Sequence, residues 1–166
     1  ALAYAKECGL PVVIVRLFNT VGPRQSGRYG MVIPRFVSQA LAGQPLTIFG
    51  DGSQTRCFIH VKDVVSVLVK LVDEPAAVGM VFNVGSQEEV SILHLAHLVR
   101  EMTGSSSPVV LTDPRDTYGS GFEDMHRRVP DISRIHRLTG FVPTLDLRCI
   151  ISDVIADQKA AGTPAP

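Results

Sequence analysis

Hydrophobic patterns typical of helices and of strands alternate along this chain. From residue 12 to residue 17 the apolar run is almost continuous and rich in β-branched residues, as in a strand buried on both faces of a parallel sheet. Apolar residues at helical spacing between 33 and 41 predict an amphipathic helix that ends before Gly43. The same spacing predicts further helices over residues 61–72, 92–102 and 147–155.

Shorter apolar runs predict strands over residues 46–49, 55–61, 81–84 and 109–111. The first two are separated by turn-forming residues, which predicts a hairpin that brings Thr47, Phe49 and Arg56 close together. Residues 112–130 are a long, charged stretch without periodicity, and loops of this length are usually functional. The alternation of helices and strands indicates a mixed α/β fold.

The first residues have the composition of a helix end. Residues 1–8 are good helix formers, Gly9 stands at the position just after them, and Pro11 blocks continuation of the helix. The chain begins with Ala1 rather than Met, and no capping residue precedes this helix. We therefore expect these 166 residues to be the C-terminal piece of a longer chain.

Composition and charge argue against several classes of protein. Hydrophobic residues make up 45% of the chain and 16 basic side chains balance 16 acidic ones, which excludes disorder and argues against a nucleic-acid partner. No apolar stretch is long enough to span a membrane, so we expect no membrane partner. The three cysteines are far apart, as expected for free thiols in a cytoplasmic protein, and the scattered histidines predict no metal site.

Two candidate ligand-binding positions follow from the predicted strand at 12–17 and the helix after it. Phe18 and Asn19 leave that strand at its carboxyl end, where open α/β sheets bind ligands, although Asn is equally common as a turn starter. Gly30, Met31 and Val32 lead into the next helix, whose first N–H groups can face an anion. An ordinary helix start has the same sequence pattern.

Arginines supply the other candidate positions. Arg56 beside Phe49 would form a platform for a planar base or a phosphate, or would be a surface side chain on a hairpin. Arg127 and Arg128 follow Asp124 in the long loop, where they could grip a diphosphate or sugar hydroxyls. The same charges could equally form a solvated salt-bridge cluster.

Four motifs occur in order along the chain. They are Arg-Leu-Phe-Asn-Thr-Val-Gly-Pro-Arg at 16–24, Gly-Asp-Gly-Ser-Gln-Thr-Arg-Cys-Phe-Ile-His-Val-Lys-Asp at 50–63, Phe-Asn-Val-Gly at 82–85 and Arg-Arg-Val-Pro-Asp-Ile-Ser at 127–133. In order and spacing they resemble the C-terminal half of the extended short-chain dehydrogenases, the NAD-dependent nucleotide-sugar epimerases, dehydratases and decarboxylases. The resemblance covers the chain to about residue 157.

The resemblance implies an α/β fold, namely the C-terminal substrate-binding part of an extended Rossmann-type protein, with small mixed sheets and helices. Residues 1–30 would be the tail of the Rossmann domain, 31–157 the nucleotide-sugar-binding domain and 158–166 a disordered tail. It also implies that Phe18 contacts NAD. The implied substrate contacts are Asn19, Gly30, Met31, Val32, Thr47, Ile48, Phe49, Arg56, Asp124 and one of Arg127 or Arg128.

In this family a Gly-rich loop holds NAD and a Tyr-x-x-x-Lys pair carries out the proton chemistry. Neither motif occurs in these residues, so we expect no catalytic residue in this chain and no activity from it alone. The parent protein would be a nucleotide-sugar epimerase or dehydratase, with a UDP-sugar favoured, and by family analogy a homodimer. The alternatives are a non-catalytic binding or scaffold protein on the same fold, or a GDP- or dTDP-sugar dehydratase or decarboxylase.

Overall fold

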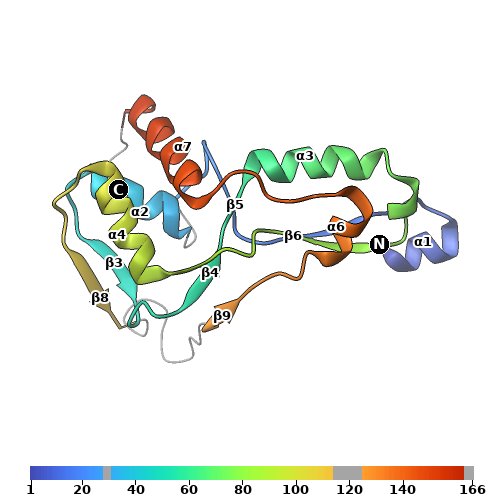
Figure 1. The fold of residues 1–166 in the computed structure, drawn as a ribbon, viewed down its shortest axis with the longest axis horizontal. Helices are drawn as coiled ribbons and strands as arrows, with labels where there is room; N and C mark the ends of the chain where they lie inside the picture. Colours follow the sequence, from blue (N-terminus) through green and yellow to red (C-terminus); the bar gives the residue numbers. More distant parts are fainter. Residues whose placement is uncertain (28–30, 114–124, 163–166) are drawn as a thin grey trace.

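The computed structural model describes residues 1–27, 31–113 and 125–162, which form an elongated molecule with a wide and a narrow end (Figure 1). The wide end, which we call the helical lobe, contains α2 (Val32–Leu41), β3 (Leu46–Phe49), α4 (Ile92–Thr103), β8 (Val109–Thr112) and α7 (Leu147–Ala160). The narrow end, which we call the arm, contains β1 (Ile14–Leu17), α3 (Val61–Val72), β6 (Val81–Val84) and α6 (Ser133–Thr139).

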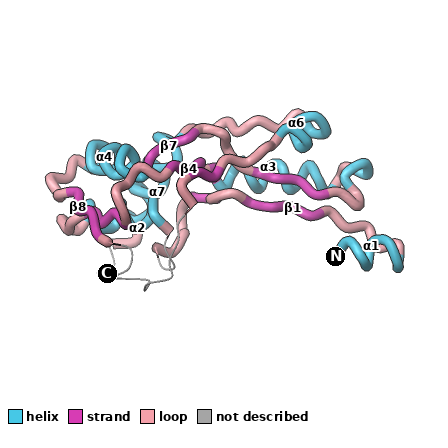
Figure 2. The backbone as a smooth tube through the Cα atoms, turned by 90° about the horizontal axis from the view of Figure 1, so that it is seen from below, coloured by secondary structure: helices cyan, strands magenta, loops and turns pink. Residues whose placement is uncertain are grey.

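Short strands lie between the helical lobe and the arm. They are β2 (Thr20–Val21), β4 (Thr55–Cys57), β5 (Ile59–His60), β7 (Glu89–Ser91) and β9 (Arg127–Arg128). The helix α1 (Leu2–Cys8) lies at the far end of the arm and buries none of its residues (Figure 2). Gly9 follows it with a φ of 66°, which confirms the predicted helix end.

The helical lobe has a closed hydrophobic core. On α2 the side chains of Ile33, Phe36 and Val37 are fully buried, as their helical spacing predicts. This face packs against α4 and α7, whose apolar side chains complete the same core. Strand β3 pairs in parallel with β8 and turns Leu46 and Ile48 into the core, so that alternate residues of β3 face outward.

The arm is built on the parallel pair of β1 and β6, in which Leu17 lies opposite Val84. Helix α3 contributes Val64 and Val67 to a second, smaller core on one face of this pair. The prediction that β1 is buried on both faces is wrong, because Leu17 is 46% exposed. Among the described residues only β6 pairs with β1, so much of the strand stays uncovered.

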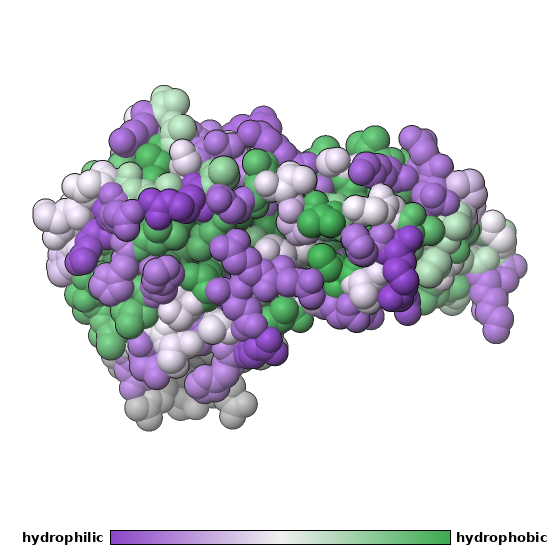
Figure 3. All heavy atoms as spheres, viewed as in Figure 1, coloured by the Kyte–Doolittle hydropathy of each residue, from purple (hydrophilic) through white to green (hydrophobic). Residues whose placement is uncertain are grey.

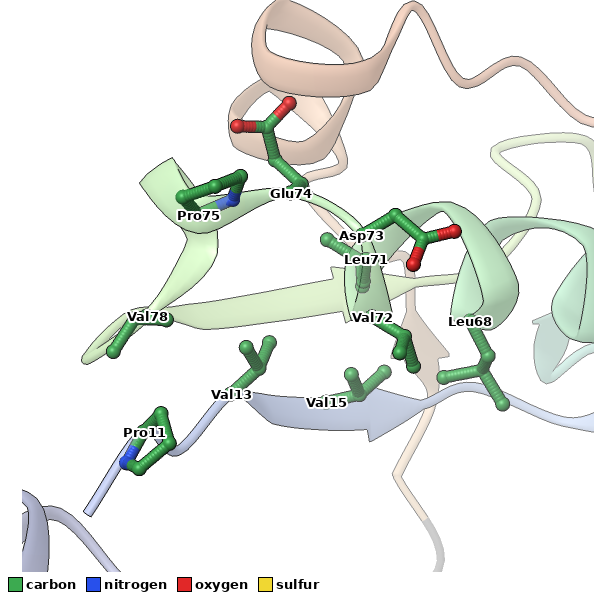
Figure 4. A pocket seen from close by; sticks show the side chains of 10 residues that line it. All are labelled: Pro11, Val13, Val15, Leu68, Leu71, Val72, Asp73, Glu74, Pro75 and Val78. Atoms are coloured by element: carbon green, nitrogen blue, oxygen red, sulfur yellow. The ribbon is translucent and has the colours of Figure 1, made fainter.

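An apolar groove of about 520 Å³ lies between β1, the end of α3 and the short helix η1 (Pro75–Ala77) (Figure 4). Val13 and Val15 point into it from the chain of β1, and Leu68 and Val72 point into it from α3. Both the groove and the uncovered strand therefore belong to the arm. In the space-filling view, apolar and polar atoms are interspersed over the wide and the narrow end (Figure 3).

A buried carboxylate joins the arm to the helical lobe. Asp63 on α3 accepts hydrogen bonds from Thr144 N at 3.0 Å, Thr144 Oγ1 at 2.6 Å and Leu145 N at 3.1 Å, just before α7 begins. At the surface, Lys62 Nζ lies 2.8 Å from Asp153 Oδ2 of α7. These contacts fix α3 and α7 relative to each other.

Most predicted elements occur at the predicted residues, including α2, α3, α4, β3 and β6. The predicted hairpin is wrong, because β3 pairs with β8 while β4 pairs with β7 and β9. The strand predicted over 55–61 is split into β4 and β5, and Val61 already belongs to α3. His60 causes this early helix start, since its Nδ1 accepts a hydrogen bond from Lys62 N.

The predicted disordered tail begins too early. Residues 158–160 continue α7, because Gln158 Nε2 donates to Pro34 O at 2.9 Å and holds the helix end against α2; residues 163–166 lie outside the described part. The predicted domain boundary at residue 30 stays a prediction, although the arm's core combines β1 with residues 59–84 and 132–141. No helix in the described ranges is long and apolar enough to cross a membrane.

Candidate functional site

The carboxyl end of β1 is tied to β4 by Asn19. Its Nδ2 donates to Cys57 O at 2.8 Å, and its own carbonyl accepts from Ile59 N at 3.3 Å. The backbone of Asn19 has a φ of 36°, a left-handed conformation that Asn tolerates better than most residues. A side-chain amide has a second N–H and an oxygen, so Asn19 can also bind a ligand at this position.

The strand β9 brings two arginines into this region. It pairs in parallel with β4, with Arg127 opposite Thr55 and Arg128 opposite Arg56. Arg56 Nη1 donates to its neighbour Thr55 O at 2.8 Å and to Met125 O at 2.7 Å, which joins β4 to the chain just before β9. The sequence pattern predicts a loop here, and the structure adds this short strand.

Arg127 and Arg128 are adjacent but have different partners. The guanidinium of Arg127 makes a bidentate pair with Glu89, with Nε 2.9 Å from Oε2 and Nη2 2.6 Å from Oε1. This hydrogen-bonded pair holds the pKa of the Glu89 carboxyl below its usual value and raises the pKa of Arg127. The guanidinium of Arg128 lies 4.9 Å from the centre of the Phe18 ring, at the end of β1.

Gly85 allows these segments to approach one another. A Cβ atom added to Gly85 would lie 2.8 Å from Phe18 Cβ and 2.8 Å from Pro130 Cγ, closer than van der Waals contact permits. Any side chain there would therefore push β9 and its arginines away from Phe18. Sequence reasoning assigned no role to Gly85, although a glycine directly after a buried strand is a signal for close backbone approach.

A second group of candidate residues lies on the outward face of β3. Arg35 on α2 has its guanidinium 4.7 Å from the centre of the Phe49 ring, and its Nη2 donates to Thr47 O at 3.1 Å. Gln39, one turn later on α2, has its Nε2 3.3 Å from Thr47 Oγ1. Neither Arg35 nor Gln39 was predicted, and their (i, i+4) spacing on the polar face of a helix is the signal that could have found them.

The remaining candidates are less closely connected to Asn19. Ile48 is fully buried in the core of the helical lobe, so its side chain does not share the outward face of Thr47 and Phe49. Val32 packs against the same core. Met31 Sδ lies 3.6 Å from Gln25 Nε2, which also donates to Thr20 O beside Asn19.

Gly30 and Asp124 lie outside the described residues. Within the ranges that the structure covers, no group of three His, Cys, Asp or Glu side chains is placed to hold a metal ion. The described candidates thus form two groups. One gathers around the end of β1 and contains Phe18, Asn19, Arg56 and Arg128, and the other lies on β3 and contains Thr47 and Phe49.

Comparison with known proteins identifies the family. The model of the NAD dependent epimerase/dehydratase family matches residues 1–85. The chain belongs to this family. Over 145 residues it is 42% identical to UDP-N-acetyl-alpha-D-glucosaminuronate decarboxylase of Bacillus cytotoxicus. This match covers 87% of this chain and 44% of that protein. Over 146 residues it is 38% identical to UDP-glucuronic acid decarboxylase 1 of Xenopus tropicalis, covering 87% of this chain and 32% of that protein.

Solved structures of epimerases have the same fold as this family member. The epimerase Mth375 of Methanothermobacter thermautotrophicus superposes with a TM-score of 0.86 at 29% identity, over 96% of this chain and 46% of that one. UDP-glucuronic acid 4-epimerase of Bacillus cereus superposes with a TM-score of 0.84 at 31% identity, over 96% of this chain and 48% of the epimerase. The chain therefore spans less than half the length of these relatives. The predicted α/β fold and the family resemblance are both confirmed.

Proposed function

We propose that this epimerase/dehydratase family member forms the nucleotide-sugar-binding part of an NAD-dependent enzyme that acts on a UDP-linked uronic acid. The observation that carries the proposal is that Asn19 binds the carbonyl of Cys57 beside Arg56, while Arg128 pairs with Arg56 and lies over Phe18. Two cations and an amide at such a position suit the diphosphate of a nucleotide sugar. The names of its relatives, UDP-uronic acid decarboxylases and a UDP-glucuronic acid 4-epimerase, support the choice of substrate class.

Of the two adjacent arginines, Arg128 is the better candidate for the diphosphate. Arg127 already has a carboxylate partner, whereas Arg128 stacks on Phe18 beside Asn19. Charge-assisted hydrogen bonds contribute about 1.5–3 kcal/mol each. Three such groups can therefore supply micromolar binding, about 8 kcal/mol, if the fold holds them in place beforehand.

The outward face of β3 is the proposed site for the base. Thr47 and Phe49 are half-buried there, and Arg35 lies over the Phe49 ring. A guanidinium stacked on an aromatic ring forms a flat polar surface, which suits the face and the carbonyl edge of a pyrimidine. A GDP- or dTDP-sugar stays the alternative, because a surface of this kind also accepts other bases.

NAD is the cofactor that the family implies, and Phe18 is the residue of this chain that fits it. Its half-buried ring lies at the carboxyl end of a parallel strand, where a flat ring system can pack, and one ring face is covered by Arg128. When bound, NAD supplies hydride transfer. This chain's own groups bind and orient the substrate, and we propose that the proton chemistry belongs to a Tyr-x-x-x-Lys pair outside these residues. A cytoplasmic homodimer is the proposed state of the whole enzyme.

Calorimetry of the full-length protein with UDP, GDP and dTDP tests this proposal. We expect UDP to bind most tightly, and Arg56→Ala and Arg128→Ala each to weaken its binding by about tenfold or more, because each removes a charge-assisted contact to the diphosphate. Arg148→Ala is the matched control, since Arg148 is an exposed arginine on α7 that pairs with Glu101 at 2.8 Å. Its affinity for UDP should equal that of the wild type.

Two results would contradict parts of the proposal. Equal UDP affinities of the wild type, Arg56→Ala and Arg128→Ala would refute the diphosphate site. Tight UDP binding without conversion of UDP-glucuronic acid in the presence of NAD would instead favour the non-catalytic binding protein.

A further inference from the structure

The geometry points to Glu89 as a positioning residue, which holds β9 against β4 through Arg127 and thereby keeps Arg128 over Phe18 for the substrate. This inference rests on the proposed diphosphate site. Glu89 is on β7, at one edge of a three-stranded sheet in the order β7-β4-β9, and β9 is at the opposite edge. Its side chain therefore reaches across β4 to hold the strand that carries both arginines.

Both oxygens of the Glu89 carboxylate accept hydrogen bonds from side chains of this sheet. Oε2 accepts from Arg127 Nε at 2.9 Å and from Thr55 Oγ1 at 3.0 Å, and Oε1 accepts from Arg127 Nη2 at 2.6 Å. Thr55 lies directly opposite Arg127 in the pairing of β4 with β9. One carboxylate thus connects the side chains of all three strands.

The strand β9 needs such a contact because it is short. It has two residues, both arginine, with exposed side chains. Successive side chains of a strand point to opposite faces. Arg127 therefore lies on the face of Thr55 and Glu89, and Arg128 lies over Phe18. The bidentate pair with Glu89 holds Arg127, and through it the strand that places Arg128 over Phe18.

A contribution to overall stability does not explain this arrangement. The side chains of Arg127 and Glu89 are 68% and 32% exposed, and ion pairs at such positions add little to the free energy of folding. A role in placing Arg128 does explain why the pair is bidentate and has Thr55 as a third member. Bidentate pairs are geometrically specific, which a purely electrostatic role would not require.

The direction of the affinity change separates positioning from simple electrostatics. Glu89→Gln removes a negative charge near the proposed diphosphate, so an electrostatic effect alone would tighten UDP binding. Displacement of Arg128 from its place over Phe18 would weaken binding. Glu88→Gln is the matched control, because Glu88 is the exposed neighbour with the same charge change and is not the partner of Arg127.

The experiment measures UDP affinity by calorimetry for the full-length wild type, Glu89→Gln, Glu88→Gln, Arg128→Ala and the double variant Glu89→Gln/Arg128→Ala. We expect Glu89→Gln to bind UDP about tenfold more weakly, while Glu88→Gln binds as tightly as the wild type or slightly more tightly. We also expect Arg128→Ala to cost less affinity in the Glu89→Gln background, because Arg128 is then no longer held at the site. Such non-additivity between two side chains without mutual contact is not expected from a merely structural role.

Amide hydrogen exchange of the segment 125–131, measured without ligand, gives a second readout. Glu89→Gln should exchange faster there than the wild type and Glu88→Gln. Additive effects of Glu89→Gln and Arg128→Ala, or unchanged exchange in Glu89→Gln, would overturn the role of Glu89. Absence of UDP binding by the wild type would refute the proposed function, and faster exchange in Glu89→Gln would still support the role of Glu89 in holding β9.

Discussion

The helical lobe and the arm bury their apolar side chains to different extents. In the helical lobe three helices enclose the inner face of β3, and Ile33, Phe36 and Val37 are fully buried. In the arm α3 covers one face of a two-stranded sheet, Leu17 is largely exposed, and an apolar groove stays open beside Val15. The helical lobe thus buries its apolar side chains, whereas the arm leaves apolar surface exposed.

The proposed substrate site lies where these two regions meet. Phe18 and Asn19 extend from the open arm, while Arg56 and Arg128 belong to the strands that connect it to the helical lobe. The position of the proposed phosphate-binding groups therefore depends on how firmly the two regions are joined. We call the contacts of Asp63 with Thr144 and Leu145 the joint between the two regions. Changes to this joint should affect both the stability of the fold and the binding of substrate.

The largest expected effect comes from breaking the joint at Asp63. Asp63→Ala leaves Thr144 N, Thr144 Oγ1 and Leu145 N without their common acceptor, and losing hydrogen bonds to a charged group of this kind costs about 3 kcal/mol. Urea unfolding followed by circular dichroism measures the change. We expect a loss of this size for Asp63→Ala and a smaller one for Asp63→Asn, which keeps an acceptor. Equal stability of Asp63→Ala and the wild type would show that the joint does not hold the two regions together.

A matched pair of core substitutions sharpens the contrast between the closed and the open region. Val37 in the helical lobe is fully buried and Val15 in the arm is half-buried, so the same change removes different amounts of buried surface. We expect Val37→Ala to lower the free energy of unfolding by about 2 kcal/mol and Val15→Ala by about 1 kcal/mol or less. Thermal or urea denaturation gives both values. A larger effect at Val15 would mean that the groove beside it is not open.

The smallest expected effect concerns acid and two aspartates at helix starts, the N-cap Asp146 of α7 and Asp131 just before α6. Hydrogen bonds from Cys149 N and Ser133 N hold the pKa values of Asp146 and Asp131 below the ordinary 3.8. A carboxylate with a lowered pKa in the folded state adds stability above its unfolded pKa, and this stability is lost as the pH falls through the folded value.

Asparagine replaces either carboxylate with an acceptor that does not titrate. Asp146→Asn and Asp131→Asn should therefore each reduce the loss of stability between about pH 5 and pH 3. Denaturation midpoints across this pH range measure the change. Identical acid profiles of both variants and the wild type would contradict the role of these hydrogen bonds.

The sequence predicted the long elements of the closed region well. Helices α2 and α4 and strand β3 have periodic apolar positions over four to twelve residues, and such periodicity is sufficient to identify them. Strands β2 and β9, with two residues each, have no periodicity. They exist only through partners far along the chain, as in the pairing of Arg56 with Arg128. Local patterns do not contain that information.

The candidate site was predictable in its residue types and less so in its geometry. The motif Phe18-Asn19 at a strand end and the arginines 56 and 127–128 were identified as candidates from the sequence. The sequence could not decide between Arg127 and Arg128, because adjacent identical residues differ only in their partners across the sheet. The prediction that a hairpin joins Arg56 to Thr47 failed for the same reason, since β3 pairs with β8 and not with β4.

The pairing of Arg56 with Arg128 has a consequence for the folded protein as a whole. Like charges on facing positions of paired strands repel each other. A diphosphate bound at the proposed site would relieve this repulsion and would bind only the folded form. At a concentration a hundredfold above its dissociation constant such a ligand stabilises the fold by about 2.7 kcal/mol. The availability of substrate would thereby govern the resistance of the protein to unfolding and to proteolysis.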